Sequence, residues 1–233
     1  MTALRFSTVS TLDMHFRQKP WDWAEANAAR IDEHWAGLQA SNPALYDGPV
    51  LVLHTGGLEG AAFRGAYLKT RFSRFIAWRD FGFEDTAMRN CFAMAALRAS
   101  DGAYLLGVMG AHTANAGRIY FPAGTPDPDD IVGDTVDLAG SVLRELGEET
   151  GLGPADVSVA ADWTLIEAPG RVACMKEVSV GGTAEAVRRR IIDTLATETQ
   201  PELSDIHIVR RPGDIDEALM PPYVAAYLRQ RLD

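Results

Sequence analysis

The chain has 233 residues, enough for one large domain or for a catalytic domain with a smaller partner region. Hydrophobic residues make up 47% and charged residues 23%, a globular balance that supports a sizeable core. The formal net charge of −10 argues against a nucleic-acid partner, because phosphate backbones repel an acidic surface. No apolar run approaches the roughly 20 residues that cross a bilayer, so we expect no membrane partner.

The first six residues lack the basic-then-apolar layout of a secretion signal, which favours a cytoplasmic protein. The two cysteines, Cys91 and Cys174, are far apart and belong to no CxxC pattern. This spacing argues against a disulfide framework and a structural zinc site. We expect both cysteines to contribute to core packing, Cys91 within a buried strand.

The first third of the chain predicts a small region of strands and helices. A strand is favoured over residues 4–11, and strands over 49–54 and 62–68 are joined by a glycine-rich turn. A helix is predicted over residues 21–39, where apolar residues recur at three- and four-residue steps.

From residue 90 onward the pattern predicts a larger layered domain. Three strands separated by turns are followed by a long loop over 122–135 with four aspartates, and then by a helix over 138–150. The remaining predicted elements are strands over 157–166 and 172–178, a helix over 184–196, a strand over 206–210 and a helix over 222–231. Strands on both sides of a central helix imply an α/β fold. We place the boundary between a 1–86 N-terminal region and an 87–233 catalytic domain.

The predicted helix over 138–150 carries three glutamates on one face. Glu145, Glu148 and Glu149 stand at positions i, i+3 and i+4, where their like charges destabilise an isolated helix. A bridging cation reverses this effect, and clustered hard oxygen ligands suit Mg²⁺, Mn²⁺ or Ca²⁺. Gly151 directly after the helix suits a left-handed C-terminal cap.

Residues Arg144 to Leu152 resemble the second half of the Nudix hydrolase signature, Arg-Glu-apolar-x-Glu-Glu-x-Gly-apolar, at every specified position. The resemblance implies an α/β/α sandwich with a mixed central sheet. It also implies hydrolysis of a diphosphate by water, with Mg²⁺ or Mn²⁺ held by Glu145, Glu148 and Glu149. Arg144 would hold a neighbouring glutamate in place through its guanidinium fork.

The general base of this family often lies outside the signature. Glu198 and Glu202 are the preferred candidates, ahead of Glu167, because each lies in or beside a predicted loop downstream of the helix. For each one alone, a surface role is the competing interpretation.

The first half of the signature departs from the family pattern. Val136 occupies the usual glutamate position and Asp130 the usual glycine position. Gly124 is the alternative family glycine if the loop after it is longer than usual. Asp134 or Asp137 would replace the missing glutamate, although we favour Asp137 as the cap of the helix.

A second resemblance covers part of the front third. Residues 42–48 and 76–81 resemble an N-terminal module of Nudix hydrolases that act on nucleotide sugars such as UDP-glucose or GDP-mannose. Arg71, Arg74 and Arg79, interleaved with aromatic residues, offer cations for a diphosphate and ring faces for a base or sugar. The alternative is an element that packs its aromatic side chains inward and leaves the arginines in solvent.

The expected function is a metal-dependent pyrophosphohydrolase that acts on a nucleotide sugar and releases a nucleoside monophosphate. Three alternatives stay open: an ADP-ribose or dinucleotide pyrophosphatase, a nucleoside triphosphatase, and a catalytically silent module that binds a nucleotide metabolite. The loops 110–116, with His112, and 127–130 are further candidates for the pocket wall. A monomer and a homodimer both stay open, since Nudix hydrolases with extra N-terminal segments are frequently dimers.

Overall fold

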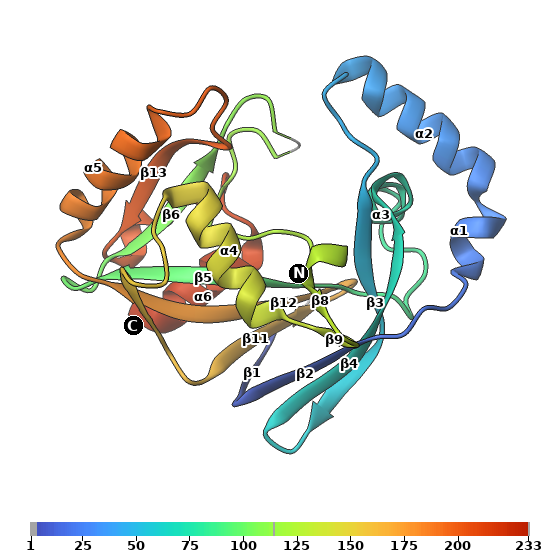
Figure 1. The fold of residues 1–233 in the computed structure, drawn as a ribbon, viewed down its shortest axis with the longest axis horizontal. Coiled ribbons are helices and arrows are strands. Elements are labelled where there is room, and N and C mark those ends of the chain that lie inside the picture. Colours follow the sequence, from blue (N-terminus) through green and yellow to red (C-terminus); the bar gives the residue numbers. More distant parts are fainter. Residues whose placement is uncertain (1–3, 114, 233) are drawn as a thin grey trace.

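The computed structural model describes residues 4–113 and 115–232, which form two β-sheets with helices on their outer faces (Figure 1). Residues 1–3, which belong to the six N-terminal residues that lack a secretion-signal pattern, lie outside the described residues. No helix of the described residues is both long and apolar enough to cross a membrane.

The larger sheet contains eight strands in the order β1-β11-β12-β5-β6-β13, with β10 beside β12 and β7 beside β6. The bounds are β1 (Arg5–Val9), β5 (Asn90–Ala99), β6 (Tyr104–Met109), β7 (Ile119–Tyr120), β10 (Val157–Val159), β11 (Trp163–Ala168), β12 (Arg171–Val180) and β13 (Leu203–Val209). The sheet is mixed, because β5 and β12 run parallel and the other paired strands run antiparallel.

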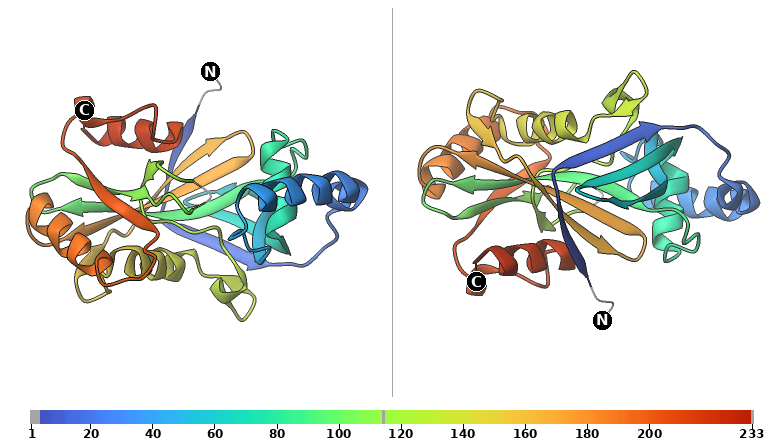
Figure 2. Two further views of the ribbon diagram at one scale, coloured as in Figure 1. Left: turned by 90° about the horizontal axis from the view of Figure 1, so that it is seen from above. Right: turned by 90° about the horizontal axis from the view of Figure 1, so that it is seen from below.

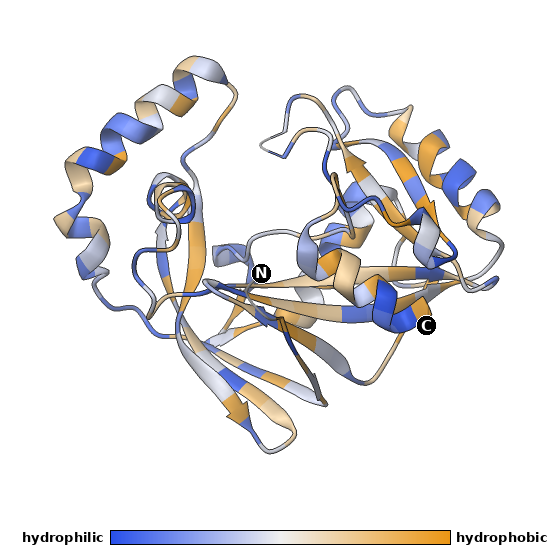
Figure 3. Ribbon diagram, turned by 180° about the vertical axis from the view of Figure 1, so that it is seen from behind, coloured by the Kyte–Doolittle hydropathy of each residue, from blue (hydrophilic) through white to orange (hydrophobic). Residues whose placement is uncertain are grey.

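Helices cover both faces of the larger sheet (Figure 2). Helices α4 (Leu138–Thr150) and α5 (Ala184–Leu195) lie on one face, and α6 (Pro222–Leu232) lies on the other. Alternate residues of β5 therefore enter two different cores: Cys91 packs on the α4 side and Phe92 on the α6 side. Strands buried on both faces are apolar along most of their length, as Figure 3 shows for the centre of this sheet. The predicted α/β/α sandwich with a mixed central sheet is confirmed.

The smaller sheet has the order β3-β4-β2-β9-β8 and carries the front helices. Its strands are β2 (Thr11–Phe16), β3 (Pro49–Glu59), β4 (Ala62–Arg71), β8 (Ile131–Val132) and β9 (Thr135–Val136). Helices α1 (Asp22–Ala26), α2 (Ala28–Ser41) and α3 (Phe72–Asp80) pack with one face of β3 and β4 in a separate apolar cluster. The opposite face of β3 and β4 contributes to the core beneath α4.

Strands cross between the two parts of the chain. Strand β1 pairs with β11 in the larger sheet, whereas β8 and β9 extend the smaller sheet through the pair His15 and Thr135. The boundary between residues 86 and 87 stays a prediction, but the structure pairs strands across it in both directions.

Several predicted elements have different limits in the structure. The strand predicted over 4–11 is two strands, β1 and β2, separated by Ser10. The helix predicted over 21–39 is interrupted at Asn27, whose side chain donates to the Trp23 carbonyl at 2.8 Å. The loop over 122–135 contains the short 3-10 helix η1 (Pro128–Asp130) and strand β8. A second short 3-10 helix, η2 (Pro212–Asp214), follows β13. The helix predicted over 138–150 is confirmed with the same limits.

Candidate active site

Local interactions at both ends fix the orientation of α4. Asp137 Oδ1 accepts the Gly140 N–H at 2.9 Å, so the interpretation of Asp137 as the helix cap is confirmed. Gly151 ends the helix with φ of 70°, a conformation that favours glycine. Val142 and Leu146 face the larger sheet, and this direction turns Glu145 and Glu149 toward the segment around Gly124.

Glu145 and Glu149 lie directly against residues 123 and 124. The Ala123 N–H donates to Glu149 Oε1 at 3.0 Å, whereas Glu149 Oε2 is buried without a hydrogen-bond partner among the described residues. A Cβ atom on Gly124 would lie 2.1 Å from Glu145 Oε1, closer than any real contact. Only glycine therefore allows this approach, and the structure brings Gly124 to the carboxylates.

Burial raises the pKa values of both carboxyl groups. The pKa of Glu149 rises to about 8 and that of Glu145 to about 7, with the charge of Glu202 among the further causes in each case. Glu198 is exposed. Glu167 lies away from the carboxylates, in ion pairs with Arg5 and Arg89.

Arg144 connects three carboxylates around the helix. Its Nη1 atom lies 3.0 Å from Glu145 Oε1 and 3.2 Å from Glu148 Oε2, and its Nη2 atom donates to Asp130 Oδ1 at 2.9 Å. Only 2% of the Asp130 side chain is exposed, so this pair is shielded from water on one side. The guanidinium therefore sets the positions of the glutamates, as expected for a fork-shaped donor.

The two unusual positions of the signature have structural explanations. Val136 is 2% exposed and packs in the main core, where a carboxylate would lack solvent. Asp134 is turned away and pairs with Arg17 at 2.8 Å. The carboxylate from this loop that reaches the helix is Asp130, which holds Arg144.

The described residues contain no group of three His, Cys, Asp or Glu side chains that could hold a metal ion as arranged. Glu148 is kept in solvent, 61% exposed, in its ion pair with Arg144. The donor set nevertheless fits a hard divalent cation. Glu149 Oε2 has no hydrogen-bond partner among the described residues, and burial raises the pKa values of the neighbouring carboxyl groups of Glu145 and Glu149. A cation at Glu145 and Glu149 would supply the missing counter-charge.

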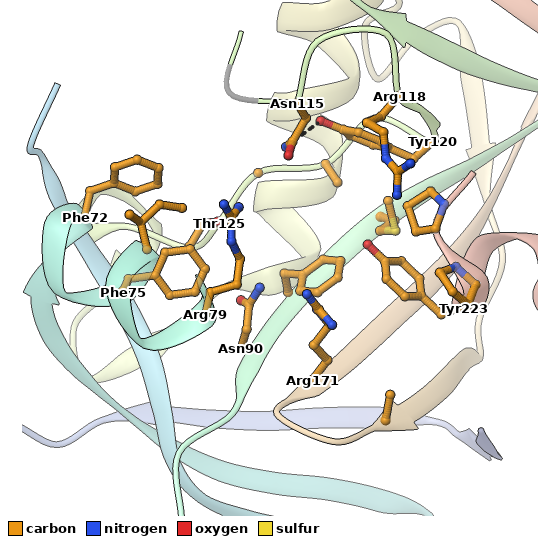
Figure 4. A pocket seen from close by; sticks show the side chains of 18 of the residues that line it. Phe72, Phe75, Arg79, Asn90, Asn115, Arg118, Tyr120, Thr125, Arg171 and Tyr223 are labelled. Carbon is orange, nitrogen blue, oxygen red and sulfur yellow. Dashed lines mark hydrogen bonds between the residues drawn. The ribbon is translucent and has the colours of Figure 1, made fainter. Parts of the chain in front are cut away.

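A cavity of about 440 Å³ opens beside residues 123 and 124. Its walls come from α3, β5, β7, the start of β12 and the start of α6, and Figure 4 shows three arginines extending toward it from different elements. The charged, polar and aromatic lining residues include Phe72, Phe75, Arg79, Asn90, Phe92, Asn115, Arg118, Tyr120, Arg171 and Tyr223. The lining thus combines positive charge with aromatic rings.

Of the three arginines selected in the front segment, only Arg79 lines this cavity. Arg71 pairs with Asp47 at 3.0 Å and Arg74 pairs with Glu25 at 2.6 Å. Neither belongs to the cavity wall, and His112 does not belong to it either. Of the predicted loop 110–116, Asn115 lines the cavity, whereas 127–130 reaches the site through Asp130 and Arg144. Residue 114 of that loop lies outside the described residues.

The segment 42–48 fixes the start of α3 and thereby the position of Arg79. Asp47 Oδ1 accepts the Ser73 N–H at 2.7 Å, and the Gly48 carbonyl accepts the Phe72 N–H at 2.8 Å. Trp78 is fully buried behind the helix, so its neighbour Arg79 is turned toward the cavity. Of the aromatic residues of α3, Trp78 packs in the core, whereas Phe72 and Phe75 line the cavity.

Sequence reasoning missed Arg118, Tyr120, Arg171 and Tyr223. Each lies outside a recognisable motif. Their side chains come together in the cavity wall only because β7, β12 and α6 meet in the folded chain. Arg171 follows a Gly-containing turn at the start of a strand, which is a weak local signal.

No protein-family model and no curated protein matches this chain. Solved structures similar to it include RenU, a Nudix hydrolase from M. smegmatis, at 15% identity and a TM-score of 0.38 over 61% of this chain and 81% of that chain. A MutT protein from Methanosarcina mazei Go1 matches at 18% identity and a TM-score of 0.39, over 61% and 92%. The pyrophosphohydrolase BsRppH from Bacillus subtilis matches at 13% identity and a TM-score of 0.31, over 55% and 65%. Because these similarities are low, we infer function from the residues of the chain itself.

Proposed function

We propose that this protein is a Nudix hydrolase, a metal-dependent pyrophosphohydrolase that cleaves the diphosphate linkage of a nucleoside diphosphate derivative. The observation that carries the proposal is the pair of half-buried Glu145 and buried Glu149, which lies against residues 123 and 124 at the edge of a cavity lined by arginines. The nine-residue signature contains Glu145 and Glu149, whereas the approach of Gly124 and the arginines of the cavity come from outside the signature.

The charge distribution supports an anionic substrate. The whole chain carries a formal net charge of −10, yet Arg79, Arg118 and Arg171 all line the cavity. A local reversal of sign at a cavity attracts anions and holds them by charge-assisted hydrogen bonds. The aromatic rings beside these arginines suit a base or a sugar ring.

Mg²⁺ or Mn²⁺ is the proposed cofactor. Glu145 and Glu149 would hold it, joined by Glu148 once that side chain leaves Arg144. When bound, such an ion supplies positive charge that stabilises the phosphate oxygens and acidifies water. Arg144 and Asp130 keep the helix carboxylates in register around the site.

Proton transfer from the attacking water is assigned to a carboxylate of the chain. Glu202 is the preferred acceptor over Glu198, because its charge acts on both Glu145 and Glu149. We expect Glu202→Gln to lower kcat with little change in KM, and Glu198→Gln to leave both unchanged.

The preferred substrate class is a nucleotide sugar, cleaved to a nucleoside monophosphate and a sugar phosphate. The front module supports it, because segment 42–48 orients α3, which contributes Phe72, Phe75 and Arg79 to the cavity. The test incubates purified protein with UDP-glucose, GDP-mannose, ADP-ribose, NADH, diadenosine polyphosphate and dGTP, with and without Mg²⁺ or Mn²⁺. A nucleoside monophosphate formed from a sugar nucleotide, only with metal, supports the proposal. Turnover of ADP-ribose or NADH instead would support the assignment as a hydrolase and reject a nucleotide sugar such as UDP-glucose or GDP-mannose as the substrate.

A silent binding module is the second candidate. It is favoured by Val136 at the usual glutamate position and because no three His, Cys, Asp or Glu side chains of the described residues are arranged to hold a metal ion. Measurable nucleotide binding without turnover of any compound in the panel would select this candidate.

A further inference from the structure

Arg171 is a half-buried cation without a carboxylate partner among the described residues. Burial lowers its pKa, the Tyr223 hydroxyl opposes this effect, and the nearby charge of Arg79 lowers the pKa further. A partly buried guanidinium that faces another cation is unfavourable unless an anion joins them. Both side chains line the cavity beside the carboxylate helix.

Phe83 holds the Arg171 side chain in this position. The Arg171 guanidinium carbon lies 4.5 Å from the centre of the Phe83 ring, a cation–π contact. The Phe83 ring also packs against Trp78: the two rings meet edge-on, with their centroids 4.7 Å apart. Phe83 therefore connects the core of the front module to an arginine of the larger sheet.

The backbone around this contact is strained. Phe83 has φ of +61°, and among the described residues it is the one non-glycine residue with positive φ. The left-handed region is unfavourable for a bulky residue, and residues held in it are concentrated at functional sites. Gly170 allows the contact, because a Cβ atom there would lie 2.3 Å from the Phe83 ring.

Two further groups point to a ligand between these arginines. Arg79 uses its Nε atom for Asp80 at 2.8 Å, an interaction with its own neighbour in α3. Asn90 is directly opposite Arg171 in the β5–β12 register and lines the cavity, and its Oδ1 atom is buried without a hydrogen-bond partner among the described residues. Two cations and an unsatisfied amide thus meet in one cavity, which is the chemistry of a site for a phosphoryl group with a neighbouring hydroxyl.

We infer that Arg79 and Arg171 form a subsite for a phosphoryl group of the substrate, and that Phe83 is the positioning residue that aims Arg171 into the cavity. This inference rests on the proposed function for the identity of the substrate but not for the binding of an anion. The subsite makes the front module a structural requirement for substrate binding, since α3 supplies Arg79 and the segment that follows α3 supplies Phe83.

Arg171→Gln tests the subsite, because it removes the charge and keeps a polar side chain. We expect KM for the diphosphate substrate to rise by about 10- to 100-fold with kcat within about threefold, the signature of lost binding that is equal in the ground and transition states. Binding of inorganic pyrophosphate to the full chain in EDTA, followed by calorimetry, is expected to weaken by at least about tenfold. Arg98→Gln is the matched control, since Arg98 lies over the Tyr104 ring at 5.5 Å and outside the cavity.

Phe83→Leu tests the positioning role. It keeps apolar bulk and removes the ring face, so we expect pyrophosphate binding to weaken in the same direction as for Arg171→Gln but less. A purely structural role would lower the melting temperature and leave pyrophosphate affinity at the wild-type value, and that result would overturn the positioning role.

The two proposals fail in different ways. Pyrophosphate binding that depends on Arg171, in a protein that hydrolyses no diphosphate, would support the subsite and reject the hydrolase. Metal-dependent hydrolysis with an unchanged KM and unchanged pyrophosphate affinity in Arg171→Gln would overturn the subsite and leave the hydrolase in place. Wild-type protein that binds no pyrophosphate would also overturn the subsite.

Discussion

Glu149 combines properties that oppose each other in a protein without a bound cation. Its side chain is 4% exposed, one carboxylate oxygen accepts the Ala123 N–H, and the other has no partner among the described residues. Burial raises its pKa to about 8, so ionisation at neutral pH works against the fold. A residue that costs stability in this way is typical of a site whose counter-charge arrives with a ligand.

The raised pKa of Glu149 predicts the direction of a pH effect on stability. The carboxyl group holds its proton up to about pH 8 in the folded protein but loses it near pH 4.5 when unfolded. The folded state therefore binds more protons in this window, and the free energy of unfolding falls as pH rises from about 4.5 to 8. Glu149→Gln should flatten this slope and raise the melting temperature in EDTA at pH 7.5. An identical slope in both proteins, measured by thermal unfolding, would contradict the assignment.

At the scale of the element, α4 is held by local interactions that its own sequence encodes. The cap at Asp137, the apolar residues that face the sheet and the left-handed Gly151 all lie within the helix or next to it. For this reason the limits 138–150 and the carboxylate face could be predicted from the sequence. The contacts of the helix could not, because Ala123 and Gly124 reach the carboxylates, and Asp130 reaches Arg144, from a loop whose course depends on the core.

Two glycines of α4 are expected to respond in opposite directions to alanine. In Gly147→Ala the new Cβ meets only the Leu152 carbonyl at 3.8 Å, and mid-helix alanine is favoured by about 1 kcal/mol. In Gly151→Ala the residue keeps φ of +70° and its Cβ would lie 2.6 Å from the Thr194 side chain. We expect this second variant to lose about 1 kcal/mol or more. Chemical denaturation measures both, and equal signs for the two variants would contradict the described helix end.

At the scale of the whole molecule, the two sheets share one core. Leu51, Phe63 and Tyr67 of the smaller sheet pack in the same cluster as Leu146 of α4. The Tyr67 hydroxyl also donates to the Cys91 carbonyl at 2.9 Å, between the sheets. The cysteines contribute to this core as predicted, fully buried with their Sγ atoms 3.8 Å apart.

The shared core predicts that the chain folds as one unit. A fragment of residues 87–233 would lose β1 from the edge of the larger sheet and would leave β8 and β9 without β2. We expect this fragment to show no cooperative unfolding transition, whereas the full chain unfolds in a single transition by circular dichroism and by tryptophan fluorescence. A fragment with its own cooperative transition would instead support the independent catalytic domain predicted from the sequence.

The cavity marks the limit of what the sequence could predict. Arg79 comes from α3, Arg118 from the loop before β7 and Arg171 from β12, and no local pattern distinguishes them from surface arginines. The alternation of Arg71, Arg74 and Arg79 with aromatic residues drew attention to α3, from which Phe72, Phe75 and Arg79 line the cavity. It could not tell which arginine points inward, since that depends on the rotation of α3 fixed by Asp47 and Trp78.

The most direct test of the account is the metal dependence of UDP-glucose hydrolysis by wild-type protein and by Glu148→Gln, with uridine monophosphate measured as product. Glu33→Gln is the control, because it makes the same change on the exposed face of α2. We predict turnover that requires Mg²⁺ or Mn²⁺, a loss of about 10²-fold or more in Glu148→Gln with an unchanged fold, and no loss in the control. Equal turnover in Glu148→Gln and wild type, or turnover that persists in EDTA, would contradict the claim that the α4 carboxylates bind a catalytic cation.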